Sequence, residues 1–146
     1  MIRPTRDPAT IRPGDALPAH QQRFSQVDLV SYGAATWDWH RLHYDVEYAR
    51  AKKLPGTLVD GQAYGAVFAR VAVDWAGPRA FITRLNFKMK SMAFAGDTLL
   101  AQGEVASVRA LDGGATLVTL LQRLMNGERV CAESTTEVRI PAPLGG

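Results

Sequence analysis

Cysteine, long apolar runs and a strong excess of either charge are missing or nearly missing from this chain of 146 residues. The single cysteine, Cys131, leaves no partner for an intrachain disulfide, which is the pattern of the reducing cytoplasm, and a free cysteine is typical of a packed strand residue. No stretch approaches the ~20 apolar residues of a membrane span. Residues 1–15 hold no apolar signal segment. We therefore expect a cytoplasmic protein that makes no contact with a membrane.

The charge balance excludes a further class of partner. Lysine and arginine outnumber aspartate and glutamate by 17 to 14, and the sequence holds no arginine-rich helix and no aromatic RNA-binding signature. We expect no nucleic-acid partner, and a mildly basic surface instead suits a small anionic molecule such as a phosphorylated cofactor. The three histidines, His20, His40 and His43, lack the spacing of a known metal site, so no metal is expected.

At this length one domain is expected, and 47% hydrophobic residues suffice to fill its core. Residues 1–19 are rich in proline and predict an irregular segment, and the tail 141–146 shows no pattern. The residues between them divide into a helical first half and a second half of strands. A short strand over 20–25 precedes the first helix, and Ser25 with Asp28 at the third helical position predicts a capping box at the start of that helix.

Helical spacing of apolar residues occurs three times in the first half and predicts helices over residues 26–35, 46–52 and 62–75. Alternating patterns separated by glycine turns predict strands over residues 81–92, 98–109, 116–125 and 130–140. The last helix is long and apolar on one side. We therefore expect an α+β domain in which an antiparallel meander wraps around this helix.

The segment 36–45 gathers aromatic and titratable side chains without helical or strand periodicity, which is typical of an ordered loop. Within it, Asp38 and His43 lie five positions apart. A carboxylate and an imidazole in one loop can converge on one water molecule. The carboxylate can accept a proton from it, and the imidazole can pass a proton on because imidazole titrates near neutral pH. The same spacing fits a carboxylate that only orients a partly buried histidine, and spacing alone favours this structural role.

Asp60 and Gly61 stand at the predicted start of the long helix. The first amides of a helix have no partner inside it and carry the positive end of its dipole. Because glycine lets a ligand approach the backbone closely, a carbonyl placed there would find an oxyanion hole. An aspartate N-cap followed by glycine is the common structural alternative.

Two further groups of residues allow two interpretations each. Arg84, Lys88 and Lys90 on the first long strand could meet phosphates or form a solvated face. The small residues at the start of the long helix, from Gly61 to Ala69, could leave room for a bulky ligand or pack closely against the sheet. We favour room for a bulky ligand.

Taken together, these motifs resemble the MaoC-like dehydratases, also called (R)-specific enoyl-CoA hydratases. The resemblance covers roughly residues 20–140. It is carried by the Asp38-Trp39-His40-Arg41-Leu42-His43-Tyr44-Asp45 segment, by Asp60-Gly61 and by the turn Phe94-Ala95-Gly96-Asp97-Thr98. The run Asp74-Trp75-Ala76-Gly77-Pro78 is similar to actinobacterial hydratase subunits of sterol side-chain degradation in particular.

The sequence departs from the family pattern at three positions. His40 stands where the family usually has asparagine, Asp60 stands where it has a histidine beside the glycine, and Ala69 stands where some members have a serine. The first two changes alter the surroundings of the acid/base pair. The third removes a hydroxyl group and leaves the pair intact.

The resemblance implies a hotdog fold over residues 20–140, in which the sheet wraps around a central helix. It implies addition of water to a trans-2-enoyl thioester, with the water handled by Asp38 and His43 and the thioester carbonyl polarised by Gly61. The residues expected to line the substrate are Asp60, His40, Tyr64 and Ala69. CoA would be part of the substrate, so no separate cofactor is expected.

The resemblance also implies a homodimer or a heteromer with a second hotdog protein. Two alternatives remain open from the sequence: an acyl-CoA thioesterase, and a non-catalytic acyl-CoA-binding subunit of a hotdog heteromer.

Overall fold

The computed structural model describes residues 4–143. The expectations for the ends of the chain that fall on residues 1–3 and 144–146 lie outside the described residues. The three α-helices are α1 (Gln26–Thr36), α2 (Val46–Ala51) and α3 (Gly61–Ala76). The five strands are β1 (His20–Arg23), β2 (Phe81–Met89), β3 (Thr98–Ala110), β4 (Thr116–Asn126) and β5 (Arg129–Ile140).

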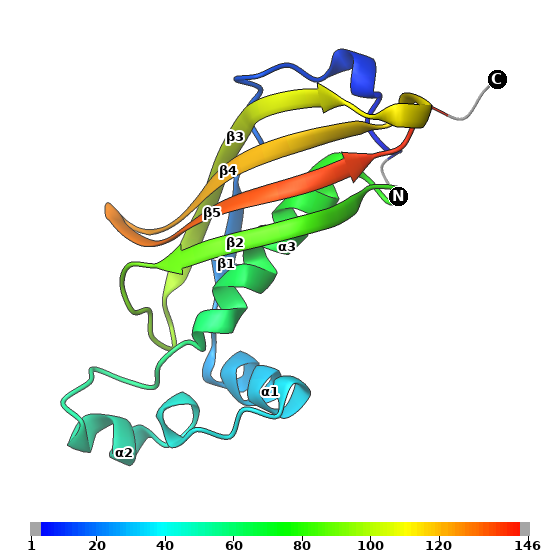
Figure 1. The fold of residues 1–146 in the computed structure, drawn as a ribbon. Helices are drawn as coiled ribbons and strands as arrows, with labels where there is room; N and C mark the ends of the chain where they lie inside the picture. Colours follow the sequence, from blue (N-terminus) through cyan, green and yellow to red (C-terminus); the bar gives the residue numbers. More distant parts are fainter. Residues whose placement is uncertain (1–3, 144–146) are drawn as a thin grey trace.

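All five strands belong to one antiparallel sheet, which lies along α3 (Figure 1). The predicted helices and strands are confirmed to within a few residues at their ends. The capping box expected at Ser25 and Asp28 is also present, since Ser25 Oγ accepts from the Asp28 amide and the Asp28 carboxylate accepts from the Ser25 amide.

The prediction of a simple meander is wrong for one strand. The strand order is β1-β3-β4-β5-β2, so β2 pairs with β5 at one edge instead of with β3, its neighbour in the chain. Strand β2 also ends at Met89, earlier than expected, because the chain then crosses the end of the sheet over residues 90–97. Backbone hydrogen bonds from Val59 to Ala93 and from Gly96 to Phe24 hold this crossing. Alternation along a strand says nothing about such a crossing.

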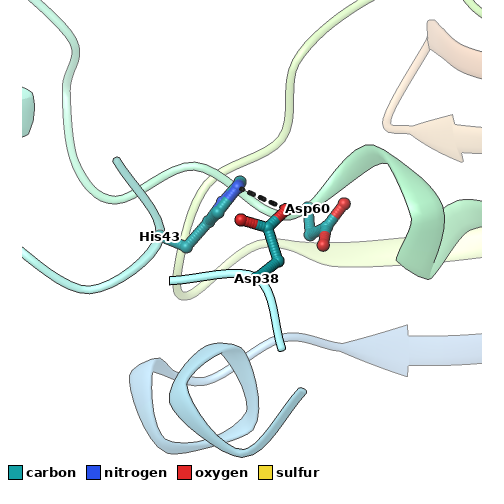
Figure 2. Close-up of side chains that lie close together, drawn as sticks. All are labelled: Asp38, His43 and Asp60. Atoms are coloured by element: carbon teal, nitrogen blue, oxygen red, sulfur yellow. Dashed lines mark ion pairs between the residues drawn. The ribbon is translucent and has the colours of Figure 1, made fainter. Parts of the chain in front are cut away.

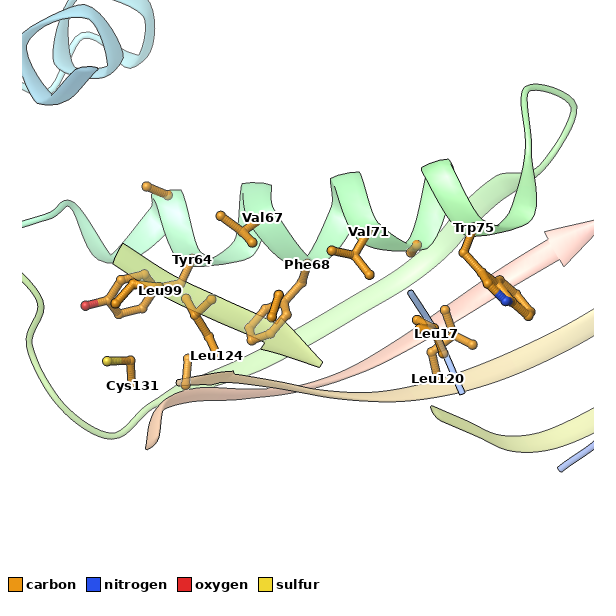
Figure 3. Packing of buried hydrophobic residues seen from close by; sticks show 14 of the residues in the cluster. Leu17, Tyr64, Val67, Phe68, Val71, Trp75, Leu99, Leu120, Leu124 and Cys131 are labelled. Carbon is orange, nitrogen blue, oxygen red and sulfur yellow. The ribbon is translucent and has the colours of Figure 1, made fainter. Parts of the chain in front are cut away.

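The core lies between α3 and the sheet (Figure 3). The helix face predicted from the sequence is buried, with Tyr64, Phe68, Val71 and Trp75 each at most 5% exposed. These side chains pack against strand residues that include Leu99, Leu120 and Leu124. Full burial of one such side chain stabilises the fold by about 1.5–3 kcal/mol.

One polar contact at the centre of this core joins the helix to the sheet. Gln122 of β4 is buried and donates a hydrogen bond from Nε2 to the Phe68 carbonyl, 3.1 Å away. Its Oε1 accepts from the Thr136 hydroxyl at 2.9 Å. Because each buried polar atom of the glutamine has a partner, the contact specifies the register of α3 along the sheet at little cost.

The segment before β1 follows the sheet and reaches the end of α3. Leu17 donates to the Gly103 carbonyl, and Ile11 and Leu17 are both buried in the core. Arg6 donates to the carbonyls of Trp75 and Ala76, which are among the last of α3 and have no partner inside the helix. This segment thereby holds the C-terminal end of α3.

Helices α1 and α2 lie beyond the end of the sheet, next to the start of α3 (Figure 1). The loop that joins them carries Asp38 and His43. Their position therefore follows from where α3 begins. Within the described residues, none of the helices is long and apolar enough to cross a membrane.

Replacing Phe68 tests the central contact between α3 and the sheet. Phe68→Ala should lower the free energy of unfolding by about 3–5 kcal/mol, because Phe68 is fully buried and its removal leaves a cavity. Urea unfolding measures the change. Val73→Ala on the exposed side of the same helix is the control and should change stability by less than about 1 kcal/mol. Similar losses in both variants would contradict this packing.

Candidate active site

Three titratable side chains from separate elements meet at the start of α3 (Figure 2). Asp38 follows α1, His43 ends a 3₁₀ turn over Arg41–His43, and Asp60 is the N-cap of α3. One nitrogen or carboxylate oxygen from each lies within 4.8 Å of the other two. The structure thus brings together the two residues singled out as an acid/base pair and places beside them Asp60, which was expected to line the substrate.

The distance between Asp38 and His43 leaves room for a water oxygen between them. Asp38 Oδ2 lies 3.9 Å from His43 Nε2, which is too far for a direct hydrogen bond. A polar contact of this length is suited to a bridging water. Both side chains retain some exposure, about 33% for Asp38 and 13% for His43, so the gap can be reached from solvent.

The orientation of the His43 ring is set by the main chain. Nδ1 lies 2.7 Å from the Leu58 carbonyl oxygen. A carbonyl only accepts hydrogen bonds, so Nδ1 carries the hydrogen and, in the neutral ring, Nε2 is left as an acceptor that faces Asp38. The Leu58 carbonyl therefore selects the tautomer in which Nε2 can act as a general base.

The Asp38 carboxylate is also held by backbone groups. Oδ1 accepts a hydrogen bond from the His40 amide at 3.1 Å, which leaves Oδ2 directed at His43. The Asp38 amide in turn donates to the Gly33 carbonyl at 3.0 Å. A Cβ atom at Gly33 would come within 2.8 Å of the Asp38 carbonyl oxygen, so glycine is needed for the loop to fold back on α1.

The sequence alone did not indicate this role of Gly33. Trp37 ends α1 in the left-handed conformation with φ 62°, and its amide donates to the Gly33 carbonyl. Its ring is 80% exposed and packs edge-to-face on Trp39, so both neighbours of Asp38 are partly solvent-exposed aromatics.

Several hydrogen bonds join the loop that carries His43 to the segment before α3. Gln26 Nε2 donates to the His43 carbonyl at 3.1 Å, and Gln26 Oε1 accepts from the buried Thr57 hydroxyl. The Leu58 amide donates to the Leu42 carbonyl at 2.8 Å. Because Leu58 also bridges to Phe94, the loop is tied to the crossing between β2 and β3.

Asp60 is buried and incompletely paired. Its Oδ1 accepts from the Gln62 amide at 2.8 Å, as an N-cap does, but no hydrogen-bond partner of Oδ2 is found among residues 4–143. The residue is only 7% exposed. Burial, and to a smaller extent the nearby Asp60 charge, raises the pKa of Tyr32. Each carboxylate of the site thus has one oxygen bound to a backbone amide, while Asp60 Oδ2 has no hydrogen-bond partner among residues 4–143.

Gly61 is the first residue of α3, as predicted, but the space beside it is filled. A Cβ atom at Gly61 would clash with Met89 Sδ, and one at Gly65 would lie 2.7 Å from the Phe87 ring. The small residues of α3 are therefore used at both positions for close packing against β2. The expectation that they leave room for a bulky ligand is wrong at these two positions.

Several predicted site residues lie elsewhere or have structural roles. Tyr64 is buried in the core, and its hydroxyl donates to the Ser91 carbonyl at 3.3 Å. Ala69 is half-buried about two turns along α3 from Gly61. His40 caps the 3₁₀ turn with its ring nitrogen, and its ring centroid lies 6.0 Å from that of His43.

The basic residues of β2 do not join the acid/base pair. Phe87 faces α3, so Arg84 and Lys88 at alternate positions face the outer side of the sheet. Lys88 lines a hollow of about 800 Å³ on that side, which none of the three clustered side chains lines. Lys90 pairs with Glu133 at 3.3 Å.

Asp45 has a role in shaping the loop. It caps α2 through the Tyr48 amide and pairs with Arg41 at 2.7 Å. The Tyr48 amide and then the Arg41 guanidinium hold the pKa of the Asp45 carboxyl below its usual value. These contacts occupy both of its oxygens and explain its place in the motif without a catalytic role.

The role of Gly33 can be tested by adding one methyl group. Gly33→Ala should displace the Asp38 carbonyl and disturb the hydrogen bonds around Asp38 and His43. The chain has only three histidines, so the NMR signals of the imidazole rings report the change. We expect the His43 and His40 signals to move and the His20 signal to stay. Ala35→Ser on the exposed face of α1 is the control, and equal shifts in both variants would contradict the role.

Tyr64 should give the protein a dependence on alkaline pH. Burial raises the pKa of Tyr64 from 10.0 to about 12. Because the pKa is higher in the folded state than in the unfolded state, the contribution of Tyr64 to stability is complete below pH 10 and is lost as the pH rises towards 12. Urea unfolding at about pH 9 and about pH 11 should show a smaller alkaline loss for Tyr64→Phe than for the wild type. Exposed Tyr44→Phe should behave like the wild type.

Known proteins of the same family have this fold and sequence pattern. The MaoC-like domain family matches residues 5–123. The beta subunit of the 3-oxo-4,17-pregnadiene-20-carboxyl-CoA hydratase of Mycobacterium tuberculosis is 28% identical over 86% of this chain and 95% of its own length.

Solved structures agree. The ChsH1–ChsH2 complex of M. tuberculosis has a TM-score of 0.74 at 26% identity over 88% of this chain and 98% of its own. The (R)-hydratase of A. caviae involved in PHA biosynthesis has a TM-score of 0.81 at 20% identity over 92% and 98%. The family match and the sheet wrapped around α3 together show that this chain belongs to the MaoC-like domain family and has its hotdog fold.

Proposed function

We propose that this protein is an (R)-specific enoyl-CoA hydratase, which in the reverse direction is a 3-hydroxyacyl-CoA dehydratase. The observation that carries the proposal is the gap of 3.9 Å between Asp38 Oδ2 and His43 Nε2 beside the first amide of α3. The hydratases among the relatives support an activity of this class. Asp38 and His43 supply the two acceptors that orient and deprotonate a water for addition to an activated alkene.

The tautomer of His43 assigns the roles of the pair. A water in the gap donates one hydrogen bond to Asp38 Oδ2 and one to the unprotonated Nε2 of His43. The water oxygen bonds to the β-carbon of the trans-2-enoyl thioester as its proton passes to Nε2, and the π electrons move to the thioester oxygen as an enolate. Nε2 then returns that proton to the α-carbon. The net result is addition of H and OH to the same face of the alkene.

The enolate oxygen needs a donor, and the start of α3 can supply one. The Gly61 amide is the first of the helix, lacks a partner inside it and lies at the positive end of the dipole. Met89 packs beside Gly61, so the thioester must displace this side chain. Met89 is 59% exposed and unbranched, which makes such a movement easy.

The remaining predicted contacts are part of the same proposal. CoA carries the acyl group and belongs to the substrate. Asp60 and His40 border the water. Substrate contacts by Tyr64 and Ala69 remain predictions, since Tyr64 is buried in the core and Ala69 lies about two turns along α3 from Gly61. Phosphate contacts by Arg84, Lys88 and Lys90 remain a prediction, and Lys90 directly follows the strand end at which Met89 covers Gly61. A cytoplasmic location also remains a prediction.

We further propose that the protein works as a homodimer or with a second hotdog protein. Strands β1 and β2 are the outer strands of the sheet, so within residues 4–143 each has one edge that pairs with no other strand, and such an edge can pair with another chain. A beta subunit and a two-protein complex among the relatives support assembly with a different partner.

Substitution of the pair tests the activity. Asp38→Asn and His43→Ala should each lower the rate of enoyl-CoA hydration by about 10²–10⁴-fold, because each removes a group that handles the proton. The loss of the conjugated thioester absorbance measures the rate, with enoyl-CoAs from crotonyl to steroid side-chain thioesters. Asp74→Asn, which removes an exposed carboxylate from the far end of α3, is the matched control. Circular dichroism checks that each variant folds.

Three results would contradict the proposal. Turnover like that of the wild type in either variant would remove its residue from the mechanism. Release of free CoA, detected with a thiol reagent, in place of hydration would favour a thioesterase. Activity that appears only with a second hotdog protein, and that survives Asp38→Asn in this chain, would make this chain a supporting subunit.

A further inference from the structure

We propose that Asp38, His43 and Asp60 form a binding site for one divalent transition-metal ion, with zinc as the probe. The proposal rests on the geometry of the three side chains and on the unpaired, buried oxygen of Asp60. It does not rest on the hydratase activity.

The three side chains offer electron pairs but no positive charge, which a cation would supply. His43 Nε2 has a free electron pair, because the hydrogen of the neutral ring is on Nδ1 and is bound to the Leu58 carbonyl. Asp38 Oδ2 faces it at 3.9 Å, and Asp60 Oδ2 is buried with no hydrogen-bond partner within the described part of the chain. Three acceptors around one point repel each other, and a buried acceptor without a partner costs free energy. A single cation pairs all three.

The distances are compatible with a small adjustment. The ligand atoms lie within 4.8 Å of one another. Zinc binds nitrogen and oxygen ligands at about 2.0–2.2 Å, so its ligands are on the order of 3–4 Å apart. Asp38, whose side chain is a third exposed, is free to make the required shift of about 1 Å or less.

The surroundings of His43 are those of a metal ligand. Metal-binding histidines donate their second ring N–H to a carbonyl or carboxylate, which fixes the ring and strengthens the ligand. His43 makes this contact to Leu58 already. Imidazole and carboxylate together suit Zn²⁺, and three protein ligands leave one position for water.

The number of sites follows from the rest of the chain. Over residues 4–143, the three clustered side chains are the single group of three or more histidine, cysteine, aspartate or glutamate residues whose ligand atoms come this close. Cys131 is buried in the core, away from the cluster. We therefore expect one zinc ion per chain.

Isothermal titration calorimetry of chelator-treated protein without a histidine tag, with zinc chloride as the titrant, tests the proposal. The wild type should bind one ion per chain. Asp60→Asn should weaken binding at least about tenfold, because it removes a charged ligand while its amide oxygen can still cap α3 at the Gln62 amide. His43→Ala should weaken it at least as much. Asp74→Asn, which also removes one carboxylate from α3, should leave the affinity unchanged.

The outcomes separate clearly. No zinc binding by the wild type, or equal affinity in Asp60→Asn, His43→Ala and the wild type, overturns the proposal. If thermal unfolding shows that Asp60→Asn does not fold, Asp38→Asn replaces it, since Asp38 is more exposed and its amide oxygen can still accept from the His40 amide. Calorimetry needs no turnover, so failure of the hydratase proposal leaves this test intact.

Discussion

The burial of α3 in the sheet is the constraint from which the rest of this molecule follows. One face of the helix fills the core. Gln122 on the sheet donates a hydrogen bond to the Phe68 carbonyl, and this contact is compatible with only one register of the helix. The segment around Arg6 holds the other end of the helix. With both position and register fixed, the first turn of α3 emerges at the end of the sheet, and Asp60 and Gly61 are placed there.

The titratable side chains around that turn are held by main-chain groups. The Leu58 carbonyl fixes His43, the His40 amide fixes Asp38, and the Gly33 carbonyl anchors the loop on α1. These main-chain contacts orient the two side chains and set the gap between them. Asp60 adds a third acceptor beside this gap. The two proposed roles, water handling and metal binding, share Asp38 and His43, so a bound metal ion would compete with the water.

The exposed features around the site suit assembly with other molecules. Trp37 and Trp39 flank Asp38 with partly exposed rings, and Met89 covers Gly61 from the end of the edge strand β2. Gly61 therefore lies next to the end of an outer strand of the sheet. A partner chain that paired with β2 would lie beside Met89, which connects the proposed assembly to access to the site.

The sequence by itself determined the helices and strands, the Ser25 capping box and the buried face of α3, and it indicated Asp38 and His43 as a candidate pair. Each of these depends on residues close together in the chain, and periodicity and spacing report such local relations. Tertiary structure alone decided that β2 pairs with β5, that Arg84 and Lys88 face away from α3, and that Met89 and Phe87 fill the space beside Gly61 and Gly65. It also decided how closely Asp60 approaches Asp38 and His43. These relations join residues far apart in the sequence, and they are fixed by how the sheet closes around the helix, which no local pattern contains.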